Sequence, residues 1–337
     1  MITIAIDLMG SDLGYEELSK SVIQYLNEEK DRRVILFGDQ EKIKPLFASI
    51  DSSRYEIVHC EDVIPMEIKP LDFLRSKKAS LYKAIDAVRN GKADAILTAG
   101  STGGFVTGCS MLLKNIEGVT RSGLCTPFPT AKEGKGTVIL DVGASNVNQS
   151  EDIYGFARMG RIYCQNVLDM ENPSTFVLSN GTEEGKGTDE IIGAYKLLKD
   201  NNFPNFQGNA EARNVLDGNH DLIVTGGFCG NIFLKATEGM ASIMNGLIKQ
   251  SFKRSLLTKI GYLFSHKGFD KMKEIMDYRR FGGAILLGVN GVAIKAHGNS
   301  NTYAFYMAIK VADQMVKSDI VNKIKKEFEH QDEKQAD

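Results

Sequence analysis

A lysine between two glycines is the residue whose surroundings point most directly to chemistry. Lys186 lies in the segment NGTEEGKGT, flanked by Gly185 and Gly187. Thr188 or Asp189 follows at a position suited to cap the next helix. A free ammonium group and free backbone amides at a helix N-terminus can share one phosphate. The spacing therefore predicts that this turn holds a phosphate-like anion.

Two further turns have the same design. An apolar strand runs into a glycine-rich turn that opens a helix in AILTAGSTGG and in DLIVTGGFCGNIFLKATEGM, as it does in TFVLSNGTEEGKGTDEII. Glycine also serves short strand-to-helix connections for geometric reasons alone. Three such turns, one of them with a lysine, still favour an anion site at the carboxyl-terminal edge of a parallel sheet.

Strand-like runs alternate with helical patterns along most of the chain. The runs are TIAID, VILFGD, YEIVHC, AILTAG, TVILDVG, TFVLSN, DLIVTG and GVAIKAH. This alternation predicts an α/β fold with a mostly parallel sheet covered by helices on both faces. TPFPTAKEGKGTVIL interrupts the pattern and is typical of a hairpin. We expect one large domain over 1–320, which includes an amphipathic helical segment at 245–280, and a charged tail that frays over 321–337.

Length and composition exclude several classes of protein. The 337 residues are enough for one large α/β domain or two, with ordinary contents of hydrophobic (42%) and charged (25%) residues. The net charge of −2 gives no global attraction to nucleic acid. Five scattered cysteines without a CxxC pair argue for a reducing cytoplasm and against a zinc site. The start, MITIAIDLMGSD, is typical of a first strand rather than a signal peptide.

The segment FKRSLLTKIGYLFSHKGFDKMKEIMDYRR combines apolar residues at helical spacing with many basic residues. Two interpretations stay open. The segment is either a helix packed on its own domain, or an exposed surface for a membrane or an acidic partner protein. The residues expected to contact a membrane or a carrier protein are Lys253, Arg254, Leu256, Leu257, Lys259, Ile260, Leu263 and Phe264.

Eight phrases of the chain occur in an order that resembles one bacterial enzyme family. They are DLMGSD, TAGSTGG, TPFPT, LDVGAS, EEGKG, GNAEAR, GGFCGNIFLKATEG and FGGAILLGVNGVAIKAHGNS. From residue 4 to about residue 316 the chain resembles the phosphate acyltransferases of phospholipid synthesis, the PlsX family. The resemblance implies transfer of a fatty acyl group from acyl carrier protein to inorganic phosphate, which yields acyl phosphate and free carrier protein.

The same resemblance implies several properties of the whole protein. The expected fold is similar to those of phosphotransacetylases and of the isocitrate and isopropylmalate dehydrogenases, with a projecting helical segment near 240–280. A cytoplasmic homodimer with peripheral membrane contact is expected, without a cofactor or a metal. A glycerol-3-phosphate acyltransferase is expected to use the product, and no nucleic acid is expected as a partner.

The resemblance also implies site residues wherever the motifs match. The first turn, usually AMGGDHAP in the family, is DLMGSD here, so any role for a histidine in it is absent. Ser101 stands where the family has the asparagine of GNTG, and Ser145 replaces the last residue of LDVGAN, so the contacts of these two side chains stay open. The residues expected to contact phosphate or the rest of the substrate are Asp7, Gly10, Gly100, Ser101, Thr102, Gly103, Asp141, Gly143, Gly181, Glu184, Gly187, Gly227, Gly230 and His297.

Elementary chemistry assigns roles to two residues in these motifs. Phosphate attack on a thioester needs the phosphate charge held in place and a donor for the tetrahedral oxyanion, because thiolate is already a good leaving group. Lys186 suits the first task. Asn231, beside Gly230, suits the second, and a helix N-cap is its alternative role. Cys229 could form an acyl-cysteine intermediate, but we favour a small turn residue there.

Two functions from other classes are the alternatives. A nicotinamide-dependent decarboxylating dehydrogenase on a similar fold would need a carboxylate cluster for a metal, and no aspartate series has suitable spacing. A non-catalytic membrane-associated scaffold would explain the basic, apolar segment but not Lys186 and Asn231. A nucleotide-binding loop is disfavoured because Asn180 replaces its first glycine and Gly187 occupies the position of its Ser or Thr.

Overall fold

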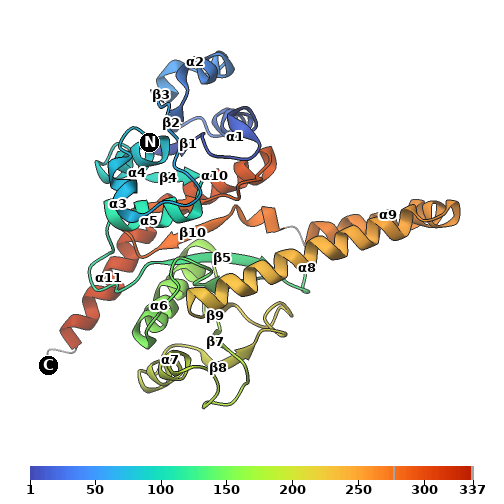
Figure 1. Ribbon diagram of the computed structural model, residues 1–337. Coiled ribbons are helices and arrows are strands. Elements are labelled where there is room, and N and C mark those ends of the chain that lie inside the picture. The colour runs from blue at the N-terminus through green and yellow to red at the C-terminus, as the bar shows by residue number, and fades with distance from the viewer. Residues whose placement is uncertain (276–277, 335–337) are drawn as a thin grey trace.

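Short apolar runs, many of them rich in β-branched residues, form the strands of one sheet. The computed structural model describes residues 1–275 and 278–334, in which these runs pair into an 11-stranded sheet (Figure 1). The order across the sheet is β3-β2-β1-β4-β11-β10-β5-β6-β9-β7-β8. The strands are β1 (Ile2–Asp7), β2 (Arg32–Gly38), β3 (Tyr55–His59), β4 (Ala95–Thr98), β5 (Gly123–Pro129), β6 (Gly136–Leu140), β7 (Thr175–Ser179), β8 (Phe206–Glu211), β9 (Leu222–Val224), β10 (Ala284–Leu287) and β11 (Val292–Lys295).

Helices cover both faces of the sheet, because successive strand residues point to opposite sides. Ile4 and Ile6 of β1 belong to the core on one face, whereas Ala5 between them belongs to the core on the other. The helices are α1 (Gly14–Glu28), α2 (Gln40–Ile43), α3 (Pro70–Arg75), α4 (Ser80–Arg89), α5 (Thr102–Leu112), α6 (Ser150–Val167), α7 (Asp189–Asp200), α8 (Gly227–Lys253), α9 (Leu256–Ile275), α10 (Thr302–Lys317) and α11 (Ile320–Lys334), with 3-10 turns at Lys44–Phe47, Ser52–Arg54 and Tyr278–Phe281.

The sheet changes direction in its middle. β10 is antiparallel to both β11 and β5, and β5 is antiparallel to β6, so β6, β9 and β7 run opposite to β1, β4 and β11. The mostly parallel sheet and the hairpin at 126–140 are confirmed. A common edge for the three glycine turns is wrong, because the turn after β4 leaves the sheet at the opposite edge from the turns after β7 and β9.

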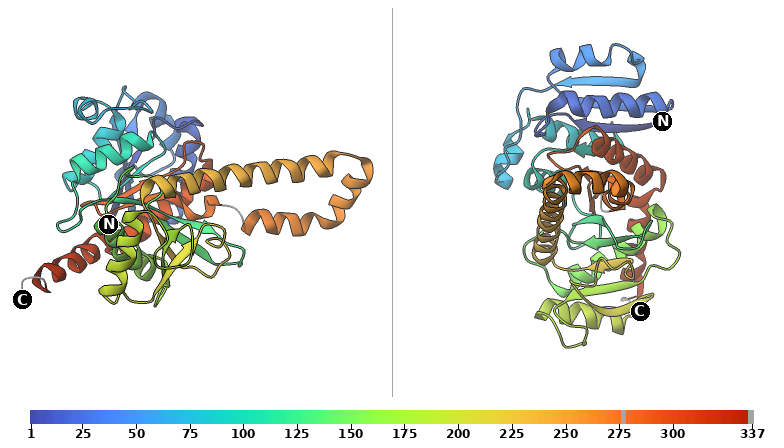
Figure 2. Two further views of the ribbon diagram at one scale, coloured as in Figure 1. Left: turned by 60° about the horizontal axis from the view of Figure 1, so that its bottom comes forward. Right: turned by 90° about the vertical axis from the view of Figure 1, so that its right-hand side faces the viewer.

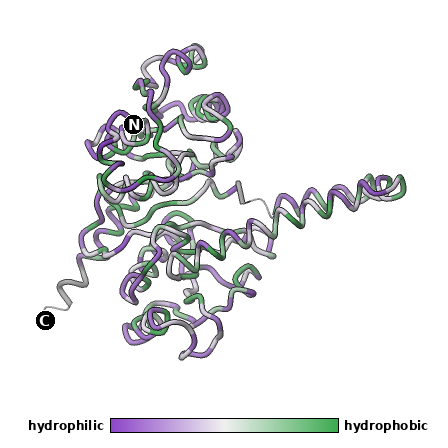
Figure 3. The backbone as a smooth tube through the Cα atoms, in the orientation of Figure 1, coloured by the Kyte–Doolittle hydropathy of each residue, from purple (hydrophilic) through white to green (hydrophobic). Residues whose placement is uncertain are grey.

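The two longest helices project from the body of the molecule. α8 and α9 form a helical hairpin, here called the α8–α9 hairpin, that extends far beyond the sheet (Figures 1 and 2). Apolar and polar residues alternate along it (Figure 3). The projecting segment expected near 240–280 is thereby confirmed. Among the described residues, no helix combines the length and the hydropathy needed to span a membrane.

The C-terminal segment differs from the expected frayed tail. α11 continues past residue 321 and packs against α6, with Ile320, Ile324 and Phe328 all buried. The guanidinium of Arg158 on α6 lies 3.8 Å from the centre of the Phe328 ring. Apolar residues at helical spacing therefore anchor this charged segment at least as far as Phe328. The last part of the expected tail, residues 335–337, lies outside the described residues.

Candidate active site

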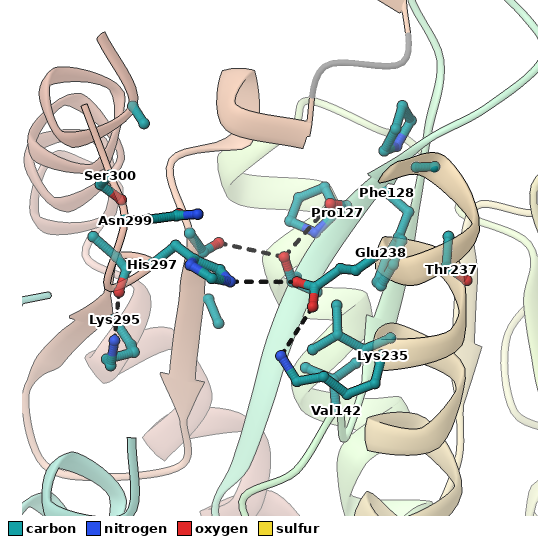
Figure 4. Close-up of a pocket in the computed structure, with 18 of the residues that line it drawn as sticks. Pro127, Phe128, Val142, Lys235, Thr237, Glu238, Lys295, His297, Asn299 and Ser300 are labelled. Atoms are coloured by element: carbon teal, nitrogen blue, oxygen red, sulfur yellow. Dashed lines mark hydrogen bonds and ion pairs between the residues drawn. The ribbon is translucent and has the colours of Figure 1, made fainter. Parts of the chain in front are cut away.

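A large cavity lies between the middle of the sheet and the α8–α9 hairpin. It has a volume of about 950 Å³. It is lined by β5, the start of β10, α8, α9 and the turns after β4, β6 and β11. Figure 4 shows α8 on one side of it, β11 with the turn that follows on the other, and β5 between them. The two oppositely directed halves of the sheet meet at β10 and β5, so turns from both halves reach the same cavity.

Three neighbouring strands end at one level beside this cavity. Asp7 of β1 and Lys295 of β11 are both register partners of Thr98, the last residue of β4. Lys295 lines the cavity although only 7% of it is exposed, and its Nζ donates to the carbonyl of Ala296 at 2.5 Å. Burial lowers the pKa of Lys295 to about 8, while the negative charges of Asp7 and Asp12 oppose that shift.

Asp7 holds the turn after β4 in place instead of facing the cavity directly. Its Oδ2 accepts a hydrogen bond from Thr98 Oγ1 at 2.8 Å, and Thr98 Oγ1 accepts one from the Gly100 amide at 2.9 Å. Its Oδ1 accepts from the amide of Met9 at 3.0 Å. Burial raises the pKa of Asp7 to about 6, against the hydrogen bonds that it accepts. We therefore regard Asp7 as a positioning residue.

A second polar group joins α8 to the turn after β11. Lys235 Nζ donates to Glu238 Oε2 at 2.9 Å, and His297 Nε2 lies 3.6 Å from Glu238 Oε1 (Figure 4). Donation from His297, with a further contribution from Lys235, lowers the pKa of Glu238. All three side chains line the cavity. Glu238 therefore joins Lys235 to His297, and Lys295 lines the same cavity.

Asn231 reaches the cavity from the first turns of α8. Gly226 occupies the N-cap position and the helix begins at Gly227, so Asn231 is not a helix cap. Gly143 lies opposite it with φ of +129°, and a Cβ on Gly143 would be 3.2 Å from the Cβ of Asn231. Asn231 is exposed to the cavity with its amide available for donation. Of the two roles considered for Asn231, the cap is excluded.

Gly227 and Gly230 are required for packing. A Cβ on Gly227 would lie 2.3 Å from Asp141 Oδ2, and a Cβ on Gly230 would lie 1.8 Å from the Asp141 carbonyl oxygen. Only glycine lets α8 approach the turn after β6 this closely. This helix-to-turn contact explains the two glycines, and their expected contact with substrate stays a prediction.

Asp141 has a structural role, and its expected contact with substrate stays a prediction. Its Oδ1 accepts from three backbone amides, and its Oδ2 accepts from the amide and hydroxyl of Ser145. Asp141 is fully buried, and burial raises its pKa against these hydrogen bonds. Ser101 is structural as well, since its Oγ accepts from the Gly104 amide and donates to the Met66 carbonyl, which caps α5.

The turn that contains Lys186 does not line the cavity. Lys186 is exposed, and its carbonyl accepts from Ser179 Oγ at 2.9 Å. Glu184 in the same turn pairs with Lys199 at 2.8 Å. β7, β9 and β6 are parallel neighbours, so Lys186 lies at the same sheet edge as Asn231. Its role in binding phosphate stays a prediction.

Only some of the site residues expected from the sequence line the cavity. The expected residues that line it are Gly100, Thr102, Gly143, Asn231 and His297. Gly181, Glu184 and Gly187 lie with Lys186 outside it, Gly103 is exposed on α5 beside the cavity, and Gly10 lines a separate cavity of about 360 Å³.

Sequence reasoning missed Lys295, Thr98, Lys235 and Glu238. One usable signal was present for Lys295, a charged residue at the end of an otherwise apolar strand. Lys235 and Glu238 gave no such signal, because charges on an amphipathic helix are usually solvated.

The tip of the α8–α9 hairpin is exposed in this chain. Leu257 is 82% exposed and Phe264 is 84% exposed, and Leu256, Ile260 and Leu263 are exposed as well. Lys253, Arg254 and Lys259 are exposed beside them. This arrangement differs from a helix packed on its own domain, which was the alternative interpretation of the segment.

Comparison with known proteins identifies relatives along the whole chain. A family model described as fatty acid synthesis protein matches residues 2–323. A phosphate acyltransferase from Mesoplasma florum is 38% identical over 330 residues, which are 97% of this chain and 100% of that protein. A phosphate acyltransferase from Staphylococcus haemolyticus is 39% identical over 93% of this chain and 94% of that protein.

Solved structures share the fold at low sequence identity. A phosphotransacetylase from Streptococcus pyogenes has a TM-score of 0.62 at 15% identity, over 94% of both chains. A 4-hydroxythreonine-4-phosphate dehydrogenase from Klebsiella pneumoniae has a TM-score of 0.51 at 12% identity, over 94% of this chain and 100% of that one. The similarity to both kinds of enzyme shows the fold alone.

Proposed function

Because this chain belongs to the family of fatty acid synthesis proteins, we propose that the cavity beneath the α8–α9 hairpin is its site of acyl transfer. The chain is an acyltransferase that moves a fatty acyl group from acyl carrier protein to phosphate for phospholipid synthesis. The dehydrogenase alternative is not favoured, since the curated relatives that cover the chain are phosphate acyltransferases.

One observation carries the assignment of the site. The cavity is lined by the polar side chains of Lys295, His297 and Asn231 and also by apolar residues of the two long helices, among them Leu234, Met272 and Ile275. A reaction that joins a phosphate to an acyl chain needs both environments next to each other. A cavity that held only a phosphate would not need the apolar lining.

The reaction beside the polar side chains has few requirements. A phosphate oxygen attacks the thioester carbonyl carbon, a C–O bond forms, and the carbonyl oxygen becomes an oxyanion. The C–S bond then breaks, and carrier protein leaves as the thiolate. We assign Lys295 to phosphate binding and the Asn231 amide to the oxyanion, because preorganised donors at developing charge lower such barriers most.

Lys186 acts in the same step from the turn after β7. It shares a sheet edge with Asn231, and Gly187 has φ of +121°, a left-handed conformation that favours glycine. An ammonium group there can contribute to the electrostatic attraction that holds the phosphate in the site. A non-catalytic scaffold, the other alternative, would not explain why Lys186 and Asn231 are present.

We assign contact with the carrier protein and with the membrane to the tip of the hairpin. Its basic residues suit an acidic carrier protein, and its exposed leucines and Phe264 suit the apolar layer of a bilayer surface. The product carries a fatty chain that is poorly soluble, so peripheral membrane contact would help to deliver it to the glycerol-3-phosphate acyltransferase that uses it. The protein in this proposal works in the cytoplasm at the membrane surface.

We assign the homodimer interface to the face of α8 that points away from the cavity. Exposed apolar residues recur there along more than five turns of helix, and they are Phe228, Ile232, Met240, Ile243, Met244 and Leu247. The cavity-lining residues of α8 lie on its other side. A second copy of this chain is the occupant that the family resemblance favours, because a patch of this size is unusual on a monomer.

A thiol-release assay tests the proposed function. Purified protein is mixed with acyl carrier protein that bears a fatty acyl thioester, and free thiol is measured with and without inorganic phosphate. We expect release that depends on phosphate, together with acyl phosphate trapped by hydroxylamine. Release at the same rate without phosphate, or no release at all, would contradict acyl transfer to phosphate.

A further inference from the structure

The large cavity extends along α8 and α9. Its lining residues on α8 include Asn231, Leu234, Glu238 and Ala241, at spacings of three and four that describe one helix face. On α9 they begin at Gly268 and continue to Ile275. Ala241 and Gly268 are the outermost lining residues of the two helices, and both are small.

Ala241 and Gly268 bound the cavity on the side of the hairpin tip. Neither residue has a side chain larger than a methyl group, so neither fills the space between the two helices.

A cluster of three aromatic rings joins the two helices. The ring of Phe252 lies 5.0 Å from that of Tyr262 and 4.6 Å from that of Phe269, measured between centroids. Tyr262 and Phe269 are 6.3 Å apart by the same measure. Phe252 and Tyr262 are nearer the tip in sequence than Ala241 and Gly268, so this cluster limits how far an extended apolar ligand can reach along the hairpin.

An ion pair holds α9 over the sheet. Lys271 lines the cavity, and its Nζ lies 2.5 Å from Glu133 Oε1 in the turn between β5 and β6. Leu124 and Phe128 of β5 also line the cavity. The cavity is therefore a channel bounded by β5, α8 and α9.

We propose that this channel binds the hydrocarbon chain of the acyl thioester and that Ala241 and Gly268 set the longest chain it accepts. The inference rests on the proposed function for the identity of the ligand. The chain runs from the carbonyl at Asn231 outward along α8, and its methyl end lies beside Ala241 and Gly268. Each methylene that the channel buries should raise kcat/KM about fourfold until the channel is full.

Gly268→Leu provides the sharpest test. A Cβ at this position meets no heavy atom within 4 Å, so the larger side chain enters open space without displacing the helix. Leucine also has a higher helix propensity than glycine. Gly261→Leu is the matched control, because Gly261 lies two turns away on the same helix, has equal space, and does not line the cavity.

The measurement is kcat/KM for phosphate-dependent thiol release across saturated acyl carrier proteins from short to long chains. We expect Gly268→Leu to lower kcat/KM most for the longest chains, about fourfold for each methylene excluded, so that the preferred chain is shorter. Ala241→Leu should shift the preference in the same direction, and Gly261→Leu should follow the wild type. A Gly268→Leu profile parallel to that of the wild type would overturn the assignment.

A binding measurement separates this inference from the proposed function. A fluorescent polyene fatty acid is titrated into each protein without phosphate or carrier protein. The wild type and Gly261→Leu should bind it saturably, and Gly268→Leu should bind it at least tenfold more weakly. Binding in this pattern without any thiol release would refute the function and keep the channel, whereas thiol release with equal binding by all three proteins would refute the channel and keep the function.

Discussion

The end of β11 gives the cavity its most unusual charge. Lys295 is a nearly buried cation on a strand that is otherwise apolar, and Thr98 lies between it and Asp7 in the sheet. A buried ammonium is costly unless an anion or a negative side chain compensates it. Asp7 and Asp12 supply part of that compensation before substrate binds. A phosphate in the cavity would supply the rest.

The pH dependence of turnover should report on Lys295. Its pKa is lowered to about 8, so the ammonium is present below that pH and is lost above it. We expect kcat/KM for phosphate to fall as pH rises through about 8. Ionised Asp7 raises the pKa of Lys295, so Asp7→Asn should move this basic limb to lower pH, and Lys295→Arg should move it to higher pH.

Comparison among variants isolates this effect, because the titration of phosphate itself is common to all of them. The profiles are measured with a short-chain thioester at saturating concentration. A basic limb that stays at the same pH in wild type, Asp7→Asn and Lys295→Arg would show that Lys295 does not titrate in the reaction.

Lys186→Ala should retain the fold and lose most turnover. The side chain is exposed on a turn, so its removal costs little stability, whereas a missing preorganised charge typically costs on the order of 10²–10³ in kcat. Circular dichroism and thiol release check the two halves of this prediction. Cys229→Ser is the control, since Cys229 is exposed and does not line the cavity, and it should remain active.

Near-normal turnover in folded Lys186→Ala would remove Lys186 from the mechanism and leave Lys295 as the phosphate ligand. An inactive but folded Cys229→Ser, with an acylated wild-type enzyme seen by mass spectrometry, would instead revive a covalent cysteine route.

At the scale of elements, the α8–α9 hairpin separates two tasks along its length. Near the sheet its inner face lines the cavity, and at the tip its exposed leucines lie beside basic residues. The aromatic cluster of Phe252, Tyr262 and Phe269 joins the two helices. Substitutions at the tip should therefore affect encounter with partners more than chemistry.

Leu257→Glu combined with Ile260→Glu should lower binding to anionic liposomes by about 10²-fold. Each exposed aliphatic side chain contributes roughly 1.5–3 kcal/mol when it becomes buried, and membrane affinity scales with that buried area. Liposome co-sedimentation measures the effect, and turnover of a short-chain thioester should stay close to that of the wild type. Leu71→Glu, at an exposed leucine of α3, is the control and should retain liposome binding.

Reversal of charge at the same tip should have a different signature. Lys253→Glu combined with Arg254→Glu should slow association with acyl carrier protein, and the difference from wild type should shrink as salt concentration rises. Stopped-flow measurements at several ionic strengths check this. If both double variants unfold, the segment contributes to the core of an assembly and is not a free contact surface.

At the scale of the whole molecule, both faces of the sheet carry a core that runs across it. One cluster joins Leu18 of α1 with Phe156 of α6, and the other joins Phe105 of α5 with Ile223 of β9. Each cluster therefore includes residues from both of the oppositely directed halves. This continuity favours a single domain, whose core extends to Ile324 and Phe328 of α11, with β10 and β5 as the connection between the halves.

A buried ion pair ties the start of the chain to its end. Asp313 Oδ1 of α10 lies 2.5 Å from Arg32 Nε of β2 and accepts from the Tyr25 hydroxyl of α1 at 3.1 Å. Asp313→Ala should lower the free energy of unfolding by about 3 kcal/mol, because Arg32 would lose its buried partner. Urea unfolding followed by circular dichroism measures the change.

Asp31 provides the matched control for this pair. It also contacts Arg32, at 2.5 Å, but its side chain is 76% exposed. Asp31→Ala should therefore change the free energy of unfolding by less than about 1 kcal/mol. Equal effects of the two substitutions would mean that burial does not strengthen the Asp313 contact.

The sequence by itself determined the fold class, the strand-like runs and the projecting helical segment, because periodicity and turn residues are local properties. The motifs also led to the family and thereby to acyl transfer. Asn231 and His297 were found because each stands in a glycine-containing turn or just beyond one. These features depend on residues close together in the chain.

Only the tertiary structure decided which of these turns meet. The reversal of strand direction at β10 and β5 brings the turns after β4, β6 and β11 to one cavity and leaves the turn after β7 outside it. Asp7, Thr98 and Lys295 became neighbours through pairing of strands that are about 90 to 200 residues apart, as the spacing in the chain shows. The structural role of Asp141 also depends on the tertiary structure, because both its oxygens accept from donors that fold around it. Strand pairing and burial are long-range properties, and no local pattern of residues encodes them.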